Sequence, residues 1–172
     1  METIFENITI ETEQLLKEAI QVANRKRFRN NKIFMALGAA AFAFLGIEWH
    51  SWILILCAVA YVGLFFWQFY LPAHNAKRHM KAKLAYYDQE NPPLTYRFFD
   101  DHFEVSNVDS WHTYPYRKLE GVIRLKSGIL VTIRHRGGCT ISLEGFQKGT
   151  PEELIAFLRT KYTQPNPANW NW

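Results

Sequence analysis

The chain has 172 residues, 48% of them hydrophobic, and carries a formal net charge of +4 at pH 7. This length leaves room for one modest domain beside a membrane segment. The positive charge does not indicate nucleic acid binding, because the basic residues gather next to two apolar runs, where a membrane surface would lie. The two cysteines, Cys57 and Cys139, provide neither a disulfide framework nor the spacing of metal ligands.

The N-terminal segment, residues 1–32, is predicted to hold a strand and a cytoplasmic helix. Ile4, Ile8 and Ile10 share one parity, which predicts a short strand with these isoleucines on one face. A threonine at position 9 or 12 can cap a helix whose first turn is acidic. Nothing up to residue 32 breaks that helix, so we expect it to continue straight into the next segment.

Residues 33–71 are predicted to form a transmembrane helical hairpin. Two apolar runs are separated by a polar break at residues 48–51, and the second run extends from Trp52 to Leu71. As an α-helix the second run is about 30 Å long, roughly the thickness of the hydrocarbon core of a bilayer. The first run reaches about 22 Å and spans a bilayer only if its helix extends at both ends.

Small side chains on both runs predict close packing between the two helices. Gly38 and Gly46, with the alanines between them, give the first helix a surface of small residues. We expect this surface to face Ala58, Ala60 and Gly63 of the second helix.

Basic residues flank the hairpin on both outer sides. They are Arg25, Lys26, Arg27, Arg29 and Lys32 before it and Lys77, Arg78 and Lys81 after it. The connecting loop has Glu48 and neither Lys nor Arg, so the positive-inside rule predicts cytoplasmic termini and an outer loop. The aromatic residues expected at the interfaces are Trp49 and Trp52 outside and Trp67 and Tyr70 inside.

The apolar runs allow two other interpretations. The hairpin could be the buried core of a soluble all-α protein, but basic clusters at both outer ends and interfacial aromatic residues disfavour this. A secretory signal is disfavoured by an acidic N-terminus and by the late start of the apolar run.

Residues 72–91 are predicted to form a juxtamembrane helix. Pro72 marks the exit of the second membrane helix, and the helix can continue to Tyr87. The sequence Asn91-Pro92-Pro93 ends it and forms a domain boundary. At the other end of the chain, residues 163–172 are rich in Pro and Asn and are predicted to be a flexible tail.

Residues 92–162 are predicted to form an antiparallel sheet closed by a C-terminal helix. Asp100 and Asp101 form a two-residue turn that places Phe98 opposite Phe103 on one apolar face. A capping box, Thr150-Pro151-Glu152-Glu153, starts the last helix. The apolar stripe of this helix is formed by Leu154, Ile155, Leu158 and Tyr162.

Two further hairpins are predicted to have three-residue loops. The loop Lys126-Ser127-Gly128, with Gly128 left-handed, places Ile123 opposite Val131. The loop at residues 136–138 aligns Ile133 with Ile141. The predicted fold class is therefore a membrane α-helical hairpin with an α+β cytoplasmic domain.

The order of these segments is similar to that of the YcxB-like family of bacterial membrane proteins. The resemblance is carried by Tyr96–Phe103 (YRFFDDHF), Tyr114–Val122 (YPYRKLEGV), Ile141–Phe146 and the final helix. It implies a two-helix membrane hairpin followed by a small PH-like domain (similar to a bacterial pleckstrin-homology fold). It also implies a location in the bacterial inner membrane and no established enzymatic activity.

The sequence contains no recognisable catalytic motif, so we predict neither an enzyme nor a cofactor. The six histidines lack the spacing of metal ligands, and we predict no metal site. An alternative enzyme would have to use Asp100, Asp101, His102 and Glu104. The acidic pair is fully explained as a hairpin turn.

One charge cluster supports a binding hypothesis, and it consists of Arg124, Lys126, Arg134 and Arg136, together with His135. These residues lie in neighbouring predicted strands and loops, where they could contact lipid headgroups or an acidic protein. The alternative is a solvated basic edge.

The leading functional hypothesis is a non-enzymatic inner-membrane protein that displays its cytoplasmic domain to a protein or lipid partner. An exposed strand edge or a basic loop would capture the partner. A more specific alternative is an immunity protein that neutralises a cognate toxin at the membrane. The expected partners are membrane lipid and a protein, with no nucleic acid, and the sequence leaves the oligomeric state open.

Overall fold

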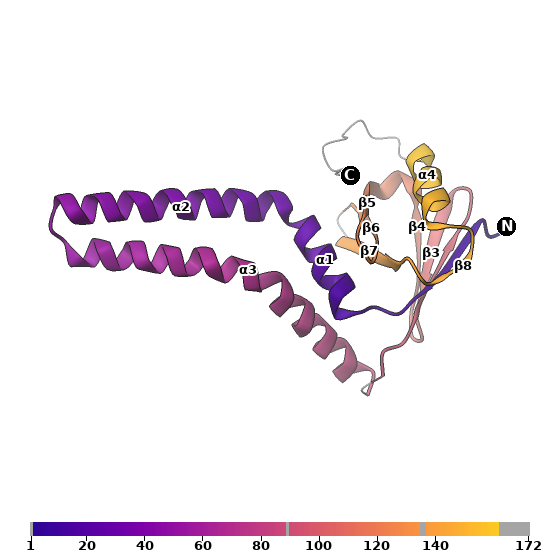
Figure 1. Cartoon of the computed structure of the whole chain (residues 1–172). Coiled ribbons are helices and arrows are strands. Elements are labelled where there is room, and N and C mark those ends of the chain that lie inside the picture. The colour runs from indigo at the N-terminus through magenta and orange to yellow at the C-terminus, as the bar shows by residue number, and fades with distance from the viewer. Residues whose placement is uncertain (1, 89, 135–136, 162–172) are drawn as a thin grey trace. The chain divides into compact units, whose positions relative to one another are not determined.

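The computed structural model describes residues 2–88, 90–134 and 137–161, apart from the side chains of Lys26 and Arg27. The chain divides into two compact units. The helical unit is Ile20–Arg78, and the sheet unit consists of Met1–Ala19 together with His79–Trp172. The sheet unit is therefore built from both ends of the chain, and the helical unit is an insertion between them (Figure 1).

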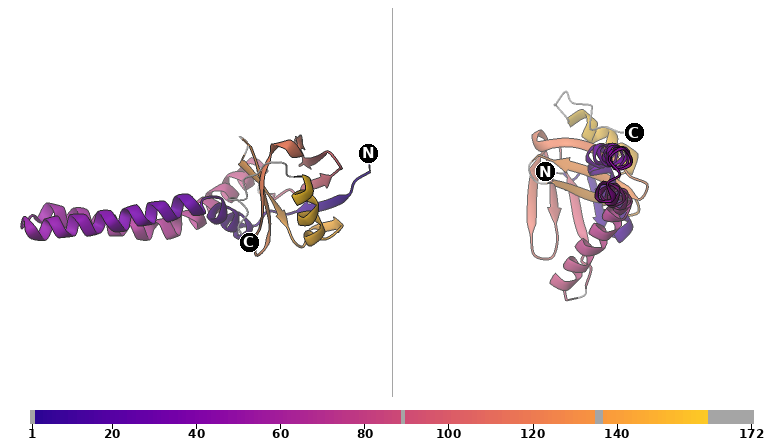
Figure 2. Two further views of the ribbon diagram at one scale, coloured as in Figure 1. Left: turned by 90° about the horizontal axis from the view of Figure 1, so that it is seen from above. Right: turned by 90° about the vertical axis from the view of Figure 1, so that its left-hand side faces the viewer.

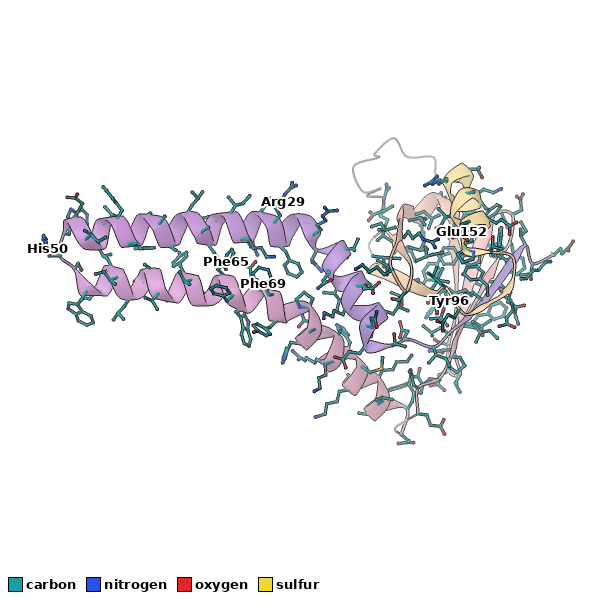
Figure 3. The ribbon with its side chains drawn as sticks, in the orientation of Figure 1. Arg29, His50, Phe65, Phe69, Tyr96 and Glu152 are labelled. Carbon is teal, nitrogen blue, oxygen red and sulfur yellow. The ribbon has the colours of Figure 1, made fainter. Side chains whose placement is uncertain are left out.

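Two long helices form most of the helical unit. They are α2 (Arg25–Glu48) and α3 (Trp52–Tyr86), and α3 extends beyond the unit. Figures 1 and 2 show α2 and the first part of α3 side by side and antiparallel, and Figure 3 labels His50 in the turn between them. The predicted polar break is confirmed. Pro72 lies inside α3, which continues past it.

Glycines on α2 let the two helices approach closely. A Cβ atom at Gly38 would lie 2.6 Å from Cε1 of Tyr61, and one at Gly46 would lie 2.8 Å from Cγ1 of Ile55. Large α3 side chains therefore fill the space that these glycines leave. Gly63 does not belong to the packed surface, because a Cβ atom there would meet nothing within 4 Å. The expectation that Gly63 faces α2 is wrong.

Both helices are long and apolar enough to cross a membrane, judged by length and composition. Only 6% and 11% of the residues in their most apolar stretches are buried. The exposed side chains include Phe34, Leu37, Phe44, Ile47, Val59 and Phe66. Such exposure is unlike the core helix of a soluble protein, whose apolar side chains are buried all round.

A single residue separates α2 from the preceding helix, α1 (Glu13–Ala23). Asn24 has φ −103° and ψ 11°, and its Nδ2 donates a hydrogen bond to the carbonyl oxygen of Ile20 at 3.0 Å. Asparagine side chains that bond locally to the backbone interrupt helices in this way. The expected continuous helix through residue 32 is therefore wrong.

The sheet unit contains two antiparallel sheets. The five-stranded sheet has the order β4-β3-β2-β1-β8, and the three-stranded sheet has the order β5-β6-β7. The strands are β1 (Phe5–Thr9), β2 (Leu94–Phe98), β3 (His102–Ser106), β4 (Trp111–Pro115), β5 (Leu119–Arg124), β6 (Gly128–Ile133), β7 (Gly137–Ser142) and β8 (Phe146–Lys148). A short 3₁₀ turn, η1 (Tyr116–Lys118), precedes β5, and α4 (Pro151–Lys161) follows β8.

The sequence did not predict whether the N-terminal strand joins the sheet of the C-terminal segment. In the structure this strand, β1, lies between β2 and β8 of the larger sheet. Its apolar face was predicted wrongly, because Ile4, Ile8 and Ile10 are exposed while the opposite face is buried. The face that carries Asn7 and Thr9 can be buried because both polar side chains are hydrogen-bonded. Asn7 Nδ2 donates to the carbonyl oxygen of Ser142 at 2.9 Å, and the Thr9 hydroxyl donates to Asn7 Oδ1 at 2.6 Å. Burial costs little when such groups are hydrogen-bonded.

The core lies between the two sheets and beneath α4. Aromatic side chains from the larger sheet, including Tyr96 (labelled in Figure 3), Phe98 and Phe103, meet the aliphatic side chains of the smaller sheet. Leu154 and Leu158 of α4 are fully buried against them. Each side chain of this size stabilises the fold by about 1.5–3 kcal/mol when it leaves water.

Two predicted local features of this unit are confirmed. Phe98 lies opposite Phe103, so Asp100 and Asp101 form the two-residue turn between β2 and β3. At the start of α4, the backbone N–H of Thr150 donates to Glu153 Oε2 at 3.0 Å, and the N–H of Glu153 donates to Thr150 Oγ1 at 3.3 Å. These reciprocal bonds are the expected capping box.

The turn between β5 and β6 has two residues, Lys126 and Ser127, and the predicted three-residue loop is wrong. That prediction assumed that each strand has one apolar face. β6 is instead buried on both faces, with every residue from Gly128 to Val131 buried. Glu18 of α1 then fixes the short turn, because its Oε2 accepts hydrogen bonds from the N–H of Lys126 (2.9 Å) and of Ser127 (3.1 Å).

Gly128 does not have the left-handed conformation predicted for it, so that prediction is also wrong. A glycine is needed there because neighbouring atoms of Ile141 and Leu15 approach its Cα closely. A Cβ atom there would lie 2.4 Å from the carbonyl oxygen of Ile141 and 2.5 Å from Cδ1 of Leu15.

The hairpin between β6 and β7 has a different register from the predicted one. Ile133 lies opposite Gly137, and Ile141 lies opposite Ile129, although both isoleucines face the core.

Candidate functional site

Two described members of the predicted basic cluster, Lys126 and Arg134, lie far apart in the structure. Lys126 lies in the turn before β6 and Arg134 directly follows β6, so the length of that strand, about 20 Å, separates them. Arg124 Nη1 pairs with Oε1 of Glu152 (labelled in Figure 3) at 2.7 Å, and Arg134 Nε lies 3.7 Å from Glu120 Oε1. These contacts bind the strands to neighbouring elements of the fold. Arg136 and His135 lie outside the described residues.

The acidic turn and His102 do form a small cluster. His102 Nδ1 lies 2.6 Å from Asp101 Oδ1, and its Nε2 lies 3.5 Å from Glu104 Oε1. The hydrogen bond to His102 is the main cause that holds the pKa of Asp101 below its ordinary value. The ring also stacks on Phe99, with 4.8 Å between centroids, and Lys161 pairs with Asp100 at 2.6 Å. This arrangement fastens the turn to α4.

No metal site is found in the part of the chain that the structure describes, where no group of three His, Cys, Asp or Glu side chains has an arrangement that could hold a metal ion. Cys139 lies opposite Val131 and packs against the core, as a small hydrophobic residue would. Burial, and then the charge of Glu11, raise the pKa of Cys139 to about 12. Its thiol is therefore protonated at neutral pH and a poor nucleophile.

The outer face of the five-stranded sheet offers a different candidate. The register places Ile8, Thr95, Ser106 and Trp111 in one row across β1, β2, β3 and β4. The next row along the strands is charged and runs through Glu6, Arg97 and Glu104, with Arg97 Nε 2.9 Å from Glu6 Oε1. Because β-strand side chains alternate between faces, both rows point away from the core. We call this surface the outer face.

A groove of about 390 Å³ lies at the β3–β4 end of the outer face. Arg97 and Glu104 line it, together with Trp111 and the loop that joins β3 to β4. Asn107 holds this loop in shape, because its Oδ1 accepts hydrogen bonds from the N–H of Asp109 (3.0 Å) and of Ser110 (2.7 Å). The groove therefore combines a charged floor with a fixed rim.

Large apolar side chains stand exposed around this groove. Trp111 is 66% exposed, Val108 is 75% exposed, and Ile8 is 40% exposed at the other end of its row. β4 is also the last strand of its sheet among the described residues, with β3 as its neighbour on one side. An open edge strand presents free backbone donors and acceptors to another chain. The groove and this edge together form the candidate binding surface.

Sequence reasoning did not identify this surface. The strand at Trp111–Pro115 was not predicted, although Trp111 and Thr113 alternate with His112 and Tyr114. The preceding polar segment, residues 106–110, is a turn signal that could have located it. The position of Ile8 in the same row as Trp111 depends on pairing between distant segments, which no local pattern reveals.

The predicted interfacial residues fall at the two ends of the helical unit. Trp49 and Trp52 are exposed at the turn between α2 and α3. Trp67 and Tyr70 are exposed on α3, toward the end where Arg25, Arg29 and Lys32 begin α2 and Lys77 and Arg78 follow on α3. Lys26 and Arg27 share the start of α2, and Lys81 belongs to the sheet unit.

Comparison of the chain with models of protein families, with curated proteins and with solved structures finds no match. The interpretation of the outer face therefore depends on its geometry and chemistry alone.

Proposed function

We propose that the chain is a two-pass protein of the bacterial inner membrane whose sheet unit is a non-enzymatic interaction module. The membrane part of the proposal is supported by two long apolar helices whose side chains are mostly exposed. In water such a surface would be costly, at about 25 cal/mol for each Å² of apolar area. A surrounding bilayer removes that cost.

The proposed orientation places both termini in the cytoplasm. Every Lys and Arg of the helical unit lies at the end away from the turn, and the charged residue next to the turn is Glu48, the last residue of α2. Positive residues are retained on the cytoplasmic side of a membrane. The sheet unit, which holds both ends of the chain, would then lie in the cytoplasm beside the inner leaflet.

We further propose that the sheet unit is PH-like and that the chain is a YcxB-like protein. Two antiparallel sheets followed by a helix after the last strand are compatible with this proposal. The observation that carries the interaction function is Trp111, exposed on an open edge strand beside a groove with a charged floor. Tryptophan is enriched among the residues that dominate binding energy.

The proposed mechanism is capture of a protein partner by the outer face. A segment of the partner adds a strand along β4, and its side chains enter the groove and cover Trp111. Arg97 and Glu104 supply one cation and one anion that select a partner with matching charges. The anchor keeps this surface near the membrane, so partners at the membrane meet it at a raised local concentration.

The orientation is tested by labelling single cysteines with a membrane-impermeant maleimide. In a background with Cys57→Ser and Cys139→Ser, His50→Cys should react in spheroplasts with an intact inner membrane, and Glu90→Cys should react only after the membrane is opened. Equal labelling of both positions in intact spheroplasts would contradict the orientation. Release of the chain from membranes by alkaline carbonate would contradict the anchor.

Partner capture is tested by photo-crosslinking in the cell. A benzoylphenylalanine at Val108, beside the groove, should yield a discrete crosslinked protein, whereas the same probe at Gln147 on β8 should not. Trp111→Ala should weaken binding about 30-fold, as truncation of a dominant binding residue does. His112→Ala is the matched control on the opposite face of β4 and should retain the crosslink. If the recovered protein is a toxin, the chain acts as its immunity protein. Equal crosslinking from the probes at Val108 and Gln147 would contradict the proposed binding site.

A further inference from the structure

A cavity that opens to the surface of the helical unit is separate from the surface proposed for the partner. It has a volume of about 480 Å³ and lies between the first turns of α2 and the middle of α3. Arg25, Arg29 and Lys32 of α2 line one side. The other side is lined mainly by Phe69 and Gln68 of α3. Figure 3 labels Arg29 on α2 and Phe69 on α3 at this level.

The charge in this cavity has no counter-ion in the helical unit. Among residues 20–78 the sequence has one carboxylate, Glu48, at the opposite end of α2. The Lys32 ammonium lies 3.8 Å from the centre of the Phe69 ring, a cation–π contact that leaves its charge uncompensated. Basic side chains gathered without an acidic partner repel one another, and an anion between them removes that repulsion.

A buried amide supports a polar ligand in the same place. Gln68 lines the cavity, yet its residue is only 5% exposed, deep among apolar side chains. Its Oε1 has no hydrogen-bond partner within the described residues, and its Nε2 donates to Met35 Sδ, a weak acceptor, at 2.8 Å. An unpaired buried polar atom is costly and in native structures marks a functional site or an absent partner.

We propose that this cavity binds the headgroup phosphate of an anionic phospholipid, an inference that rests on the proposed membrane anchor. The phosphate would lie between Arg25 and Lys32, and a hydroxyl group of the lipid headgroup would donate a hydrogen bond to Gln68 Oε1, the atom that lacks a partner. The apolar side chains of Phe28, Ile33 and Phe69 would contact the start of an acyl chain. A soluble phosphate lacks that apolar part, which is why the site favours a lipid over a free anion.

The site is tested by native mass spectrometry of the full chain in mixed micelles of phosphatidylglycerol and phosphatidylcholine. The wild-type chain should retain one phosphatidylglycerol in preference to phosphatidylcholine. Arg25→Gln with Lys32→Gln should lower this preference about 30-fold, since each basic residue near a membrane surface contributes a factor of about five. Lys77→Gln with Arg78→Gln removes equal charge at the same end of the unit, outside the cavity, and should change the preference far less.

The outcomes separate this site from general attraction and from failure of the anchor. Equal losses in the two double variants would show unspecific attraction and overturn the site. Competition by glycerol 3-phosphate would overturn the choice of a lipid, and Gln68→Leu with unchanged preference would overturn the role of the amide. Each variant is first incorporated into phosphatidylcholine nanodiscs and its helix content checked by circular dichroism. A wild-type chain that stays in solution without lipid or detergent would instead refute the membrane anchor.

Discussion

The carboxylate of Glu18 joins α1 to the turn between β5 and β6, and its protonation should affect stability. Partial burial opposes its ionisation, but hydrogen bonds from Ser127, Gln14 and Lys126 outweigh burial and lower the pKa of Glu18 below its ordinary value of 4.5. A carboxyl group whose pKa is lower in the folded state stabilises the fold above its unfolded pKa. That contribution is lost as the pH falls through the folded pKa.

We therefore expect Glu18→Gln to lower the free energy of unfolding by about 1 kcal/mol at pH 7. The difference from the wild type should shrink as the pH falls below 4.5, because the wild-type carboxylate is then protonated as well. Thermal unfolding followed by circular dichroism in detergent, at pH 7 and at acid pH, measures both effects. Glu13→Gln, on the exposed side of α1, is the control, and a difference that persists unchanged in acid would contradict the assignment.

Gly128 is a second residue with a specific expected effect. A methyl group there would overlap the carbonyl oxygen of Ile141, which belongs to the backbone of β7 and cannot move aside cheaply. We expect Gly128→Ala to destabilise the sheet unit by about 2 kcal/mol, the usual cost of overpacking. Gly63→Ala, where the added atom meets nothing, should leave the thermal midpoint almost unchanged. Similar midpoints for the two variants would contradict the close approach at Gly128.

At the scale of elements, a sequence pattern predicted register only where a strand has one buried face. β2 and β3 bury Phe98 and Phe103 on the core side and expose Arg97 on the other, so alternation fixed their pairing correctly. β6 buries Leu130 on one face and Ile129 on the other, so alternation carried no information there. The two-residue turn depends on Glu18, more than 100 residues away, which local reasoning could not include.

The cap of α4 gives a prediction at this scale. Thr150 accepts a hydrogen bond from the N–H of Glu153 through its hydroxyl, and that N–H would be unpaired without it. We expect Thr150→Ala to cost about 1 kcal/mol and to speed hydrogen exchange in the first turn of α4. Thr160→Ala removes a hydroxyl that bonds within the helix to the Phe157 carbonyl, and this control should change stability little. Unchanged exchange in the Thr150 variant would contradict the cap.

The candidate site was harder to foresee than the fold. Basic residues such as Arg124 and Arg134 attracted attention in the sequence because they lie close together along it, but the structure uses them in ion pairs. The outer face depends on β1 lying beside β2, and that pairing joins residues as far apart as Glu6 and Arg97, 91 positions along the chain. Surfaces formed by such long-range pairing cannot be found by periodicity within one segment.

At the scale of the whole molecule, the central place of β1 predicts that the C-terminal segment does not fold alone. Without β1, the strand β8 has no partner in the sheet, and β2 becomes an unpaired edge that carries buried aromatic residues. A fragment of residues 79–161 should therefore give the poorly dispersed NMR spectrum of an unfolded chain. Residues 2–19 joined to it by a flexible linker in place of Ile20–Arg78 should restore dispersion. Folding of the shorter fragment would contradict the prediction.

The same arrangement has a consequence for biosynthesis. The first strand leaves the ribosome early, and its partner β2 follows only after the intervening segment has been translated, which takes about 4–17 s at typical elongation rates. Throughout that interval Phe5 has no hydrophobic neighbours from the sheet to cover it. A nascent chain whose translation stalls within Ile20–Arg78 therefore exposes β1 without its partner strands. Chaperones and proteases can recognise this exposed segment before the sheet unit is complete.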